Sequence, residues 1–328
     1  MKKIKEQATQ SLFDKQLITE DQYNQIITYR SLNIFSLNAE LKLFLYLSVL
    51  LFTSGIGILI YENINTIGHS ILISLVLILT AICYYFCFKK APKFQKEETQ
   101  FESPVMEYIV LTANLLTCIF IAYLQLQYTT FGTNYGLATL IPTAIGLFSG
   151  YYFDNKNVLS LAITGLAAYI GLTVTPQSLL QNDIYDTDSL SYAAIGLGTL
   201  LIAWNYYCSK INLKTHFALI FLTFALHLIG ISCLNNMIDN RYSLLFSVIL
   251  GATCYYLYHC SYNLKSVSLF VFTVFYAFIG LNITLFTILE AVHFDVFFEL
   301  ILTLSPIYLI GSIYLFIQMI KKFNSEIK

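Results

Sequence analysis

The sequence predicts an all-α, polytopic helical membrane protein with about ten transmembrane helices. Three observations carry this prediction: a low charge content, long apolar segments that recur along the chain, and lysines that fall in alternate loops. Of the 328 residues, 57% are hydrophobic and 11% are charged. Soluble domains carry about 25% charged residues, so this chain has too little charge for a water-exposed surface. Its net charge of −1 and the absence of a basic stripe give no indication of nucleic-acid binding.

A membrane-spanning helix needs about 20 mostly apolar residues, and ten segments of the sequence fit this requirement. They are residues 41–61, 69–88, 106–126, 135–153, 158–174, 190–208, 216–234, 243–260, 267–289 and 297–320. The first of them begins too late in the sequence for the apolar core of a cleaved signal peptide. We therefore expect this first span to be retained.

The positions of the basic residues predict the orientation. Lysine and arginine are enriched in cytoplasmic loops, and with ten spans every basic residue except Arg241 falls on the side of the two termini. A wrong number of spans would disrupt this alternation, so it supports both the number and the direction. The sequence thus predicts a cytoplasmic amphipathic helical hairpin at 1–38, a ten-span domain at 39–320 and a cytoplasmic basic tail at 321–328.

A two-helix pattern occurs three times between residues 150 and 281. Each copy has an inward-running helix that ends on a tyrosine pair, a short lysine-bearing turn, and an outward-running helix with a glycine near its outer end. The pairs are Tyr151-Tyr152, Tyr206-Tyr207 and Tyr255-Tyr256, and the glycines are Gly171, Gly230 and Gly280. This pattern indicates tandem helical hairpins. Convergence explains it equally well, because tyrosines favour membrane interfaces and small residues favour helix contacts.

The amino-terminal segment carries local helix signals and a family resemblance. Thr19 to Gln22 fits a capping box that starts a second short helix. Residues 17–26 (LITEDQYNQI) and 47–63 (LSVLLFTSGIGILIYEN) together resemble the bacterial predicted-membrane-protein family called domain of unknown function twenty-one fifty-seven. Asn63 matches an asparagine of that family, whereas Ile64 stands where its tryptophan is usual. The resemblance implies a bacterial cytoplasmic membrane and brings no activity.

Motifs of known enzymes are absent from the sequence. It contains no Walker loop, HExxH, GxSxG or dinucleotide fingerprint, so we do not expect an enzyme. The seven cysteines include no CxxC pair, and we interpret them as apolar packing residues. We expect no cofactor.

Polar residues inside the predicted spans are the first candidates for a binding site. His227 lies near the middle of the seventh span, and Asn114 and Asn282 lie within the third and ninth. A role in proton or ligand handling is one interpretation of His227, and a histidine satisfied by one partner in the bundle is the other. The default role of the two asparagines is hydrogen bonding between helices.

A second group of candidates lies between the last two spans on the outer side. It comprises Glu290, His293, Asp295 and Glu299. Carboxylates and histidine are ligand types for a divalent cation, but one such cluster without a second half fits a hydrated loop better. We therefore expect no metal there.

The leading functional hypothesis is a non-enzymatic protein that binds or moves a small solute or lipid within the helix bundle. The alternative is a structural or regulatory membrane protein that docks a cytoplasmic protein through residues 1–38. Gly146 and Gly150 form a GxxxG pair, which favours close contacts between helices. Assembly into a homo-oligomer is therefore one of the expected possibilities. The expected surroundings are the lipid bilayer of the bacterial cytoplasmic (inner) membrane.

Overall fold

The computed structural model describes residues 12–13, 17–31, 38–62, 68–99, 101, 103–132, 135–174, 188–239, 242–291 and 298–327. The chain divides into two compact units, Met1–Phe52 and Thr53–Lys328. The boundary between the units falls inside the first long helix. The division expected from the sequence at residue 38 therefore stays a prediction.

The described residues form helices and no strands, so the predicted all-α class is confirmed. A short helix, α2, is followed by ten long helices that coincide with the ten predicted spans. The helices are α2 (Glu20–Ser31), α3 (Asn38–Glu62), α4 (His69–Lys90), α5 (Pro104–Tyr128), α6 (Tyr135–Tyr152), α7 (Lys156–Val174), α9 (Asp188–Lys210), the 3-10 turn η1 (Thr215–Phe217), α10 (Ala218–Asp239), α11 (Ser243–Asn263), α12 (Val267–Ala291) and α13 (Phe298–Glu326).

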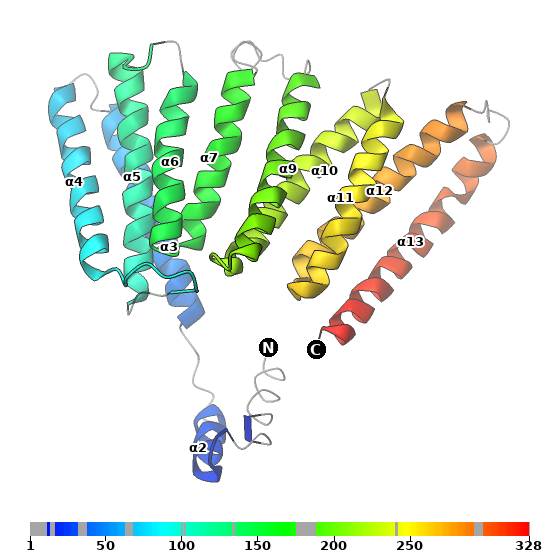
Figure 1. The fold of residues 1–328 in the computed structure, drawn as a ribbon, viewed down its shortest axis with the longest axis horizontal. Helices are drawn as coiled ribbons and strands as arrows, with labels where there is room; N and C mark the ends of the chain where they lie inside the picture. The colour runs from blue at the N-terminus through cyan, green and yellow to red at the C-terminus, as the bar shows by residue number, and fades with distance from the viewer. Residues whose placement is uncertain are drawn as a thin grey trace. The chain divides into compact units, whose positions relative to one another are not determined.

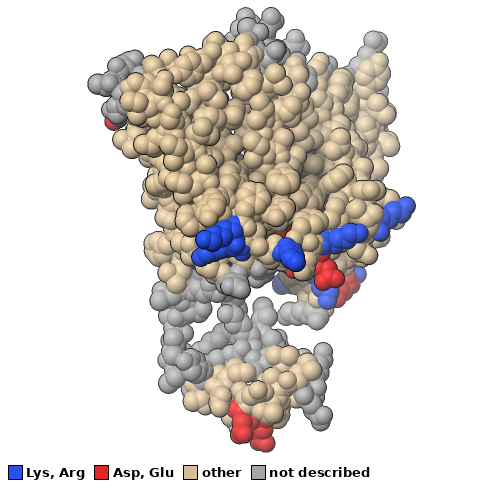
Figure 2. All heavy atoms as spheres, turned by 60° about the vertical axis from the view of Figure 1, so that its left-hand side comes forward, with Lys and Arg blue, Asp and Glu red and all other residues tan. Residues whose placement is uncertain are grey.

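Seven of these helices in the described part of the chain are long and apolar enough to cross a membrane. They are α3, α4, α5, α7, η1 with α10, α11 and α12. The chain is therefore a multi-pass membrane protein. In Figure 2, lysine and arginine side chains gather at one end of the helices, below a surface without charge.

Helices α4 to α13 follow one another in chain order as an antiparallel row (Figure 1). The closest packing joins α4 to α5, α6 to α7, α9 to α10 and α11 to α12. These are helix pairs joined at the lysine-bearing end, as the hairpin interpretation expects. Contacts of α5 with α6, α7 with α9 and α10 with α11 then link each hairpin to the next. In contrast, the described part of α13 makes few contacts, mainly with α12.

Three of the hairpin turns close in the same way. After α6, α9 and α11, one residue adopts the left-handed conformation: Asp154 (φ 56°), Asn212 (φ 51°) and Lys265 (φ 50°). The amide of the residue after it then donates to a carbonyl five residues back, which is the Schellman arrangement that ends a helix. The donor–acceptor pairs are Asn155–Gly150 at 2.9 Å, Leu213–Cys208 at 2.9 Å and Ser266–Ser261 at 3.0 Å. The repeated tyrosine–lysine pattern thus corresponds to a repeated backbone turn.

Helix α10 lies at the centre of the buried side chains. One of its faces, which carries Phe221 and Ala225, packs with α7 and α9. A neighbouring face, which includes Leu226 and Ile229, packs with α11 and α12. Because both clusters share α10, its position determines how the hairpins on either side are spaced.

The first unit contains the predicted capping box. The Thr19 amide donates to Gln22 Oε1 at 2.9 Å, and the Gln22 amide donates to Thr19 Oγ1 at 3.4 Å. The reciprocal pair confirms this helix start, which lies directly before α2. The rings of Phe13 and Tyr23 stack with centroids 4.6 Å apart. Most of the preceding helix expected from the sequence, with Ile4 and Ala8, lies outside the described residues.

Close packing inside the α6–α7 hairpin predicts that a side chain at Gly165 is not tolerated. A Cβ atom added to Gly165 would clash with Thr143 Oγ1, whereas one added to Gly196 on α9 would meet nothing within 4 Å. We expect Gly165→Val to lower the free energy of unfolding by about 1–3 kcal/mol, the usual cost of overpacking. Gly196→Val is the matched control, and unfolding titrations in detergent measure both. Equal stability of the two variants would contradict the packing described for this hairpin.

Candidate functional site

The three polar residues predicted within the spans lie at three different helix interfaces. His227 on α10 faces Tyr276 on α12, with Nδ1 and Oη 3.0 Å apart, and its ring meets Phe272 edge-on. Asn282 on α12 accepts a hydrogen bond from Tyr308 Oη on α13 at 2.8 Å. These two residues have the partners that a structural role requires, and they do not form a common site.

Asn114 differs from the other two because it is buried without a partner for its amide nitrogen among the described residues. The side chain is 1% exposed, and Nδ2 makes no hydrogen bond there. It lies on α5 against Gly146 of α6, where an added Cβ would come within 3.1 Å of Nδ2. Gly146 therefore allows α6 to pack closely against α5 within the same chain.

The acidic candidates near the last loop are not tested by the structure. His293 and Asp295 lie outside the described residues, and the side chains of Glu290 and Glu299 are not described either. Among the residues that are described, no group of three or more histidine, cysteine, aspartate and glutamate side chains could hold a metal ion. A cation site in this loop stays untested.

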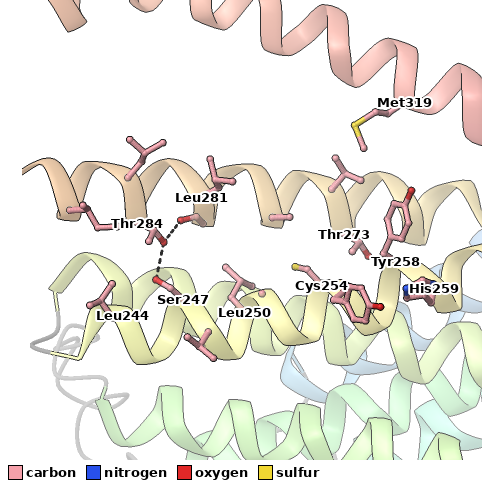
Figure 3. Close-up of a pocket in the computed structure, with 18 residues that line it drawn as sticks. Leu244, Ser247, Leu250, Cys254, Tyr258, His259, Thr273, Leu281, Thr284 and Met319 are labelled. Carbon is pink, nitrogen blue, oxygen red and sulfur yellow. Dashed lines mark hydrogen bonds between the residues drawn. The ribbon is translucent and has the colours of Figure 1, made fainter.

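The largest cavity among those described is an apolar groove along α11 and α12, which we call the α11–α12 groove (Figure 3). Its volume is about 1150 Å³, and Met319 of α13 also lines it. The α11 wall includes Leu244, Gly251 and Tyr255, and the α12 wall includes Gly280. Apolar side chains and backbone make up most of the lining, so the groove suits a hydrophobic occupant.

Helix α13 contacts the rest of the second unit near two points, which explains why a groove remains. Tyr308 holds its first half through the bond to Asn282 and a stack on Phe278. Phe323, which has no exposed surface, holds its end by packing on Phe270 at 4.2 Å and Tyr262 at 4.6 Å between ring centroids. A second cavity of about 600 Å³ lies between α12 and α13.

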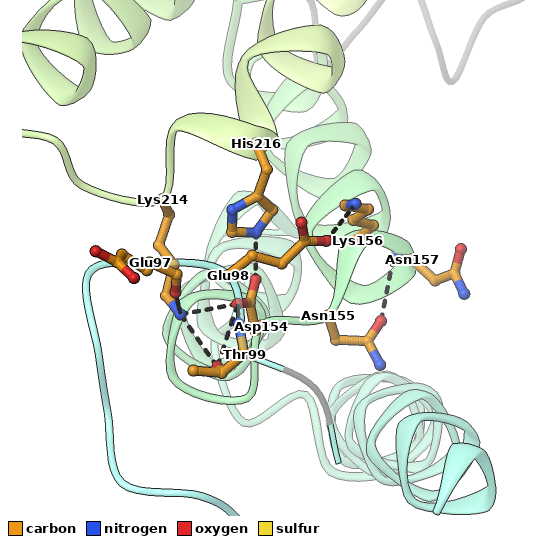
Figure 4. Close-up of polar contacts among 9 residues, drawn as sticks. All are labelled: Glu97, Glu98, Thr99, Asp154, Asn155, Lys156, Asn157, Lys214 and His216. Atoms are coloured by element: carbon orange, nitrogen blue, oxygen red, sulfur yellow. Dashed lines mark hydrogen bonds and ion pairs between the residues drawn. The ribbon is translucent and has the colours of Figure 1, made fainter. Parts of the chain in front are cut away.

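A buried ionic cluster lies at the lysine-bearing end of the helices (Figure 4). Asp154 follows α6, Lys214 directly precedes η1, and Thr99 belongs to the segment after α4. Lys214 Nζ and Asp154 Oδ2 are 2.8 Å apart, and their side chains are 0% and 1% exposed. The cluster therefore joins three segments of the chain through a pair of charges removed from water.

Each charged group of this cluster has its hydrogen-bonding capacity filled. The Lys214 ammonium donates to Asp154 Oδ2, to the Glu97 carbonyl at 2.9 Å and to Thr99 Oγ1 at 3.3 Å. Asp154 Oδ2 also accepts from the Thr99 amide at 2.6 Å, and its other oxygen contacts His216 Nε2. An ammonium has three donors, and all three are used here. The arrangement is that of a structural clamp, since both charges are buried and hydrogen-bonded to each other.

Two neighbouring contacts extend this clamp to α5 and α7. Asn155 Nδ2 donates to the Glu107 carbonyl of α5 at 2.7 Å. Its Oδ1 accepts from the amides of Asn157 and Val158 at 3.0 and 3.1 Å, which caps α7. Close by, Lys156 and Glu98 form an exposed pair at 2.9 Å.

Sequence reasoning missed the buried cluster. It counted Lys214 among the basic residues that indicate orientation, and it did not single out Asp154. The two residues are 60 positions apart, and Thr99 is 55 positions from Asp154. No local spacing connects residues so distant, so only the fold reveals the cluster.

Removing one charge of the clamp should cost much more stability than removing both. A lone buried charge costs about 3–5 kcal/mol, whereas replacing a whole buried pair by apolar groups can be close to neutral. We expect Asp154→Asn and Lys214→Met each to destabilise the protein strongly and the double variant to lose less than their sum. The exposed pair is the control, where Lys156→Met should cost less than about 1 kcal/mol. Additive losses in a double-mutant unfolding cycle would contradict the clamp.

The clamp should also weaken in acid. Burial by itself raises the pKa of the Asp154 carboxyl, but hydrogen bonds from Lys214, Thr99 and His216 outweigh it, so this pKa lies below its usual value. The resulting stability is complete above the unfolded pKa, about 3.9, and is lost as the pH falls through the folded pKa. The stability difference between wild type and Asp154→Asn should shrink below about pH 4. Thermal melts followed by fluorescence of Trp204 measure it, and a difference that stays constant with pH would argue against this assignment.

Comparison with known proteins gives one match. The model of the family described as Predicted membrane protein (DUF2157) matches residues 10–159. No curated protein and no solved structure matches the chain. The match extends the resemblance expected from the first ninety or so residues as far as α7, and it includes Asp154. Residues 10–159 are therefore similar to the family described as Predicted membrane protein (DUF2157), and this description assigns no activity.

Proposed function

We propose that this chain is a non-enzymatic protein of the bacterial cytoplasmic membrane that binds a long-chain lipid in the α11–α12 groove. The observation that carries the proposal is the groove itself, about 1150 Å³ between membrane-crossing helices and α13. Water is absent from the hydrocarbon core of a bilayer. An apolar groove at this depth is therefore filled by hydrocarbon.

The polar groups of the groove support a lipid over a water-soluble solute. The Ser247 and Thr284 hydroxyls lie 2.8 Å apart, and each also has a carbonyl of its own helix within hydrogen-bond distance. Thr273 likewise donates to the Leu269 carbonyl at 2.7 Å. A polar solute would need partners that these side chains already use, whereas an acyl chain needs none.

Movement of a solute through the bundle has less support. His227 and Asn282 are engaged by Tyr276 and Tyr308, at interfaces far from Asn114 along the row of helices. A shared polar pathway would need these residues to face one interior. Binding is therefore the part of the hypothesis that we retain.

The orientation belongs to the proposal as well. Lys89, Lys90, Lys156 and Lys265 stand at the ends or turns of helices joined on one side, and cytoplasmic loops are rich in such residues. We therefore place the buried ionic cluster and both termini in the cytoplasm.

A second candidate function is the docking of a cytoplasmic protein by the amino-terminal unit. Leu17 there is 67% exposed, and it lines a shallow cavity of about 470 Å³ with Ile18, Gln22, Gln25 and Ile26. Leu17, Ile18 and Ile26 line this cavity together, and contiguous apolar surface is a feature of protein contact sites. Pull-downs with and without residues 1–38 test this candidate, and recovery of the same proteins by both would exclude it.

Filling the groove should remove the bound lipid. Gly251 lines the groove and an added Cβ there would meet nothing within 4 Å, as at Gly196 on α9. We expect Gly251→Leu to lose crosslinks from a photoreactive acyl chain to α11 and α12, because the new side chain takes the space of that chain. Gly196→Leu is the matched control and should keep them. The measurement is peptide mapping after irradiation of the full-length protein in lipid vesicles.

Two results would contradict the proposal. One is crosslinking of α11 and α12 that merely equals that of the exposed outer face of α4, around Ile71, Leu75 and Ile78. The other is Gly251→Leu labelling equal to that of Gly196→Leu.

A further inference from the structure

We infer that the lipid in the α11–α12 groove is a phospholipid with a net negative headgroup, and that the headgroup lies at the end of the groove marked by His259. This inference rests on the proposed function, because it names the chemical class of the lipid and its direction in the same groove. Three features carry it: the polarity of the two ends, the charges beyond one end, and the length of the groove.

The two ends of the groove differ in chemistry. Leu244, Leu285 and Ile288 line one end, and Tyr258 and His259 line the other. Figure 3 shows Tyr258, His259 and Met319 together at the end opposite Leu244. Tyrosine and histidine combine an apolar ring with polar atoms, which suits them to the level of lipid headgroups. A bound amphiphile would therefore place its tail toward Leu244 and its head at His259.

The charges beyond the His259 end favour an anion. Lys265 follows α11, and Lys321 and Lys322 lie near the end of α13, all three exposed. Lys322 comes one helical turn after the lining residue Met319, so it lies on the same face of α13. The lining residues include no carboxylate. The carboxylate described near this end is Glu326, 3.8 Å from Lys322, so positive charge predominates at the mouth of the groove.

Donors at this end suit phosphate oxygens. The hydroxyls of Tyr258 and Tyr262 lie 3.2 Å apart, and the His259 ring packs edge-on against Tyr255 with centroids 4.7 Å apart. The described contacts of the His259 imidazole are therefore with aromatic rings and not with a carboxylate. Imidazole, phenol and ammonium groups are all hydrogen-bond donors, and such donors bind phosphate most strongly when one of them is charged.

The length of the groove fits a lipid tail. Leu244 and His259 both line it, and 15 residues of α-helix between them correspond to about 22 Å at 1.5 Å per residue. The hydrocarbon core of a bilayer is about 30 Å thick. A groove of this length with one polar end accommodates an extended chain whose headgroup stays at the membrane surface.

The test compares two photoreactive phospholipids that share one diazirine acyl chain, a phosphatidylglycerol and a phosphatidylcholine. The full-length protein is irradiated in phosphatidylcholine vesicles that contain one probe, and labelled peptides of α11 and α12 are counted. Each cation near a membrane surface is worth about fivefold in binding an anionic lipid. We therefore expect phosphatidylglycerol to label the groove about fivefold more than phosphatidylcholine, with a smaller ratio at high salt.

Variants at the mouth of the groove locate the preference. The double variant His259→Gln, Lys322→Gln should bring the ratio close to one while labelling by phosphatidylcholine stays unchanged, which also shows that the groove is intact. Lys156→Gln is the matched control, because Lys156 is an exposed lysine of another hairpin, and it should keep the wild-type ratio.

The other outcomes separate this inference from the proposed function. Equal labelling of the wild-type groove by both probes would overturn the anionic headgroup and leave lipid binding in place. A preference that survives the double variant would overturn the role of His259 and Lys322. Absence of groove labelling by either probe, or crosslinks from the groove to a second copy of the chain, would overturn both the inference and the proposed function.

Discussion

The buried ion pair between Asp154 and Lys214 is the interaction on which the arrangement of the first hairpins depends. Removing a carboxylate and an ammonium from water costs several kcal/mol for each ion. The pair is therefore tolerated only when all its hydrogen bonds form at once. Thr99 and Glu97 supply them from the segment after α4, and His216 supplies one from the segment that carries Lys214. The segment after α4 and the turns after α6 and α9 must thus be in place together.

This requirement extends to the packing in the membrane because Lys214 and His216 lie directly before α10. Helix α10 contributes buried residues to the clusters on both sides of it. The clamp therefore positions α10, the helix whose buried side chains link the α6–α7 hairpin on one side to the α11–α12 hairpin on the other. Beyond α10, the described chain shows no comparable clamp. Tyr308 and Phe323 hold α13 near two points, and the α11–α12 groove lies along the space they leave open.

Much of this architecture could be predicted from the sequence because the bilayer imposes simple rules. The length of a span and the side preferred by lysine gave ten segments that coincide with the ten long helices. The Thr19–Gln22 capping box was predictable because it involves neighbours in sequence. The hairpin pattern predicted which helices pack most closely. Whether the hairpins derive from one ancestral unit is not tested by their shared turns.

The site was less predictable, for physical reasons that particular residues make clear. His227 was recognised as a polar group in a span, but its partner Tyr276 is 49 residues away, so no local spacing could indicate the contact between them. Asp154 and Lys214 read as ordinary loop charges because their burial depends on three segments meeting. Hydrophobic periodicity could not predict the groove either, because apolar residues are spread around α11 and α12 without one clear apolar face. The width of the groove depends instead on the few contacts of α13.

The most direct test of lipid binding is an experimental structure of the full-length protein in a lipid nanodisc. Our account predicts continuous elongated density along Leu244, Gly251 and Tyr255, with its head near His259. A groove that contains only protein density, because α13 packs along the full length of α11 and α12, would contradict it.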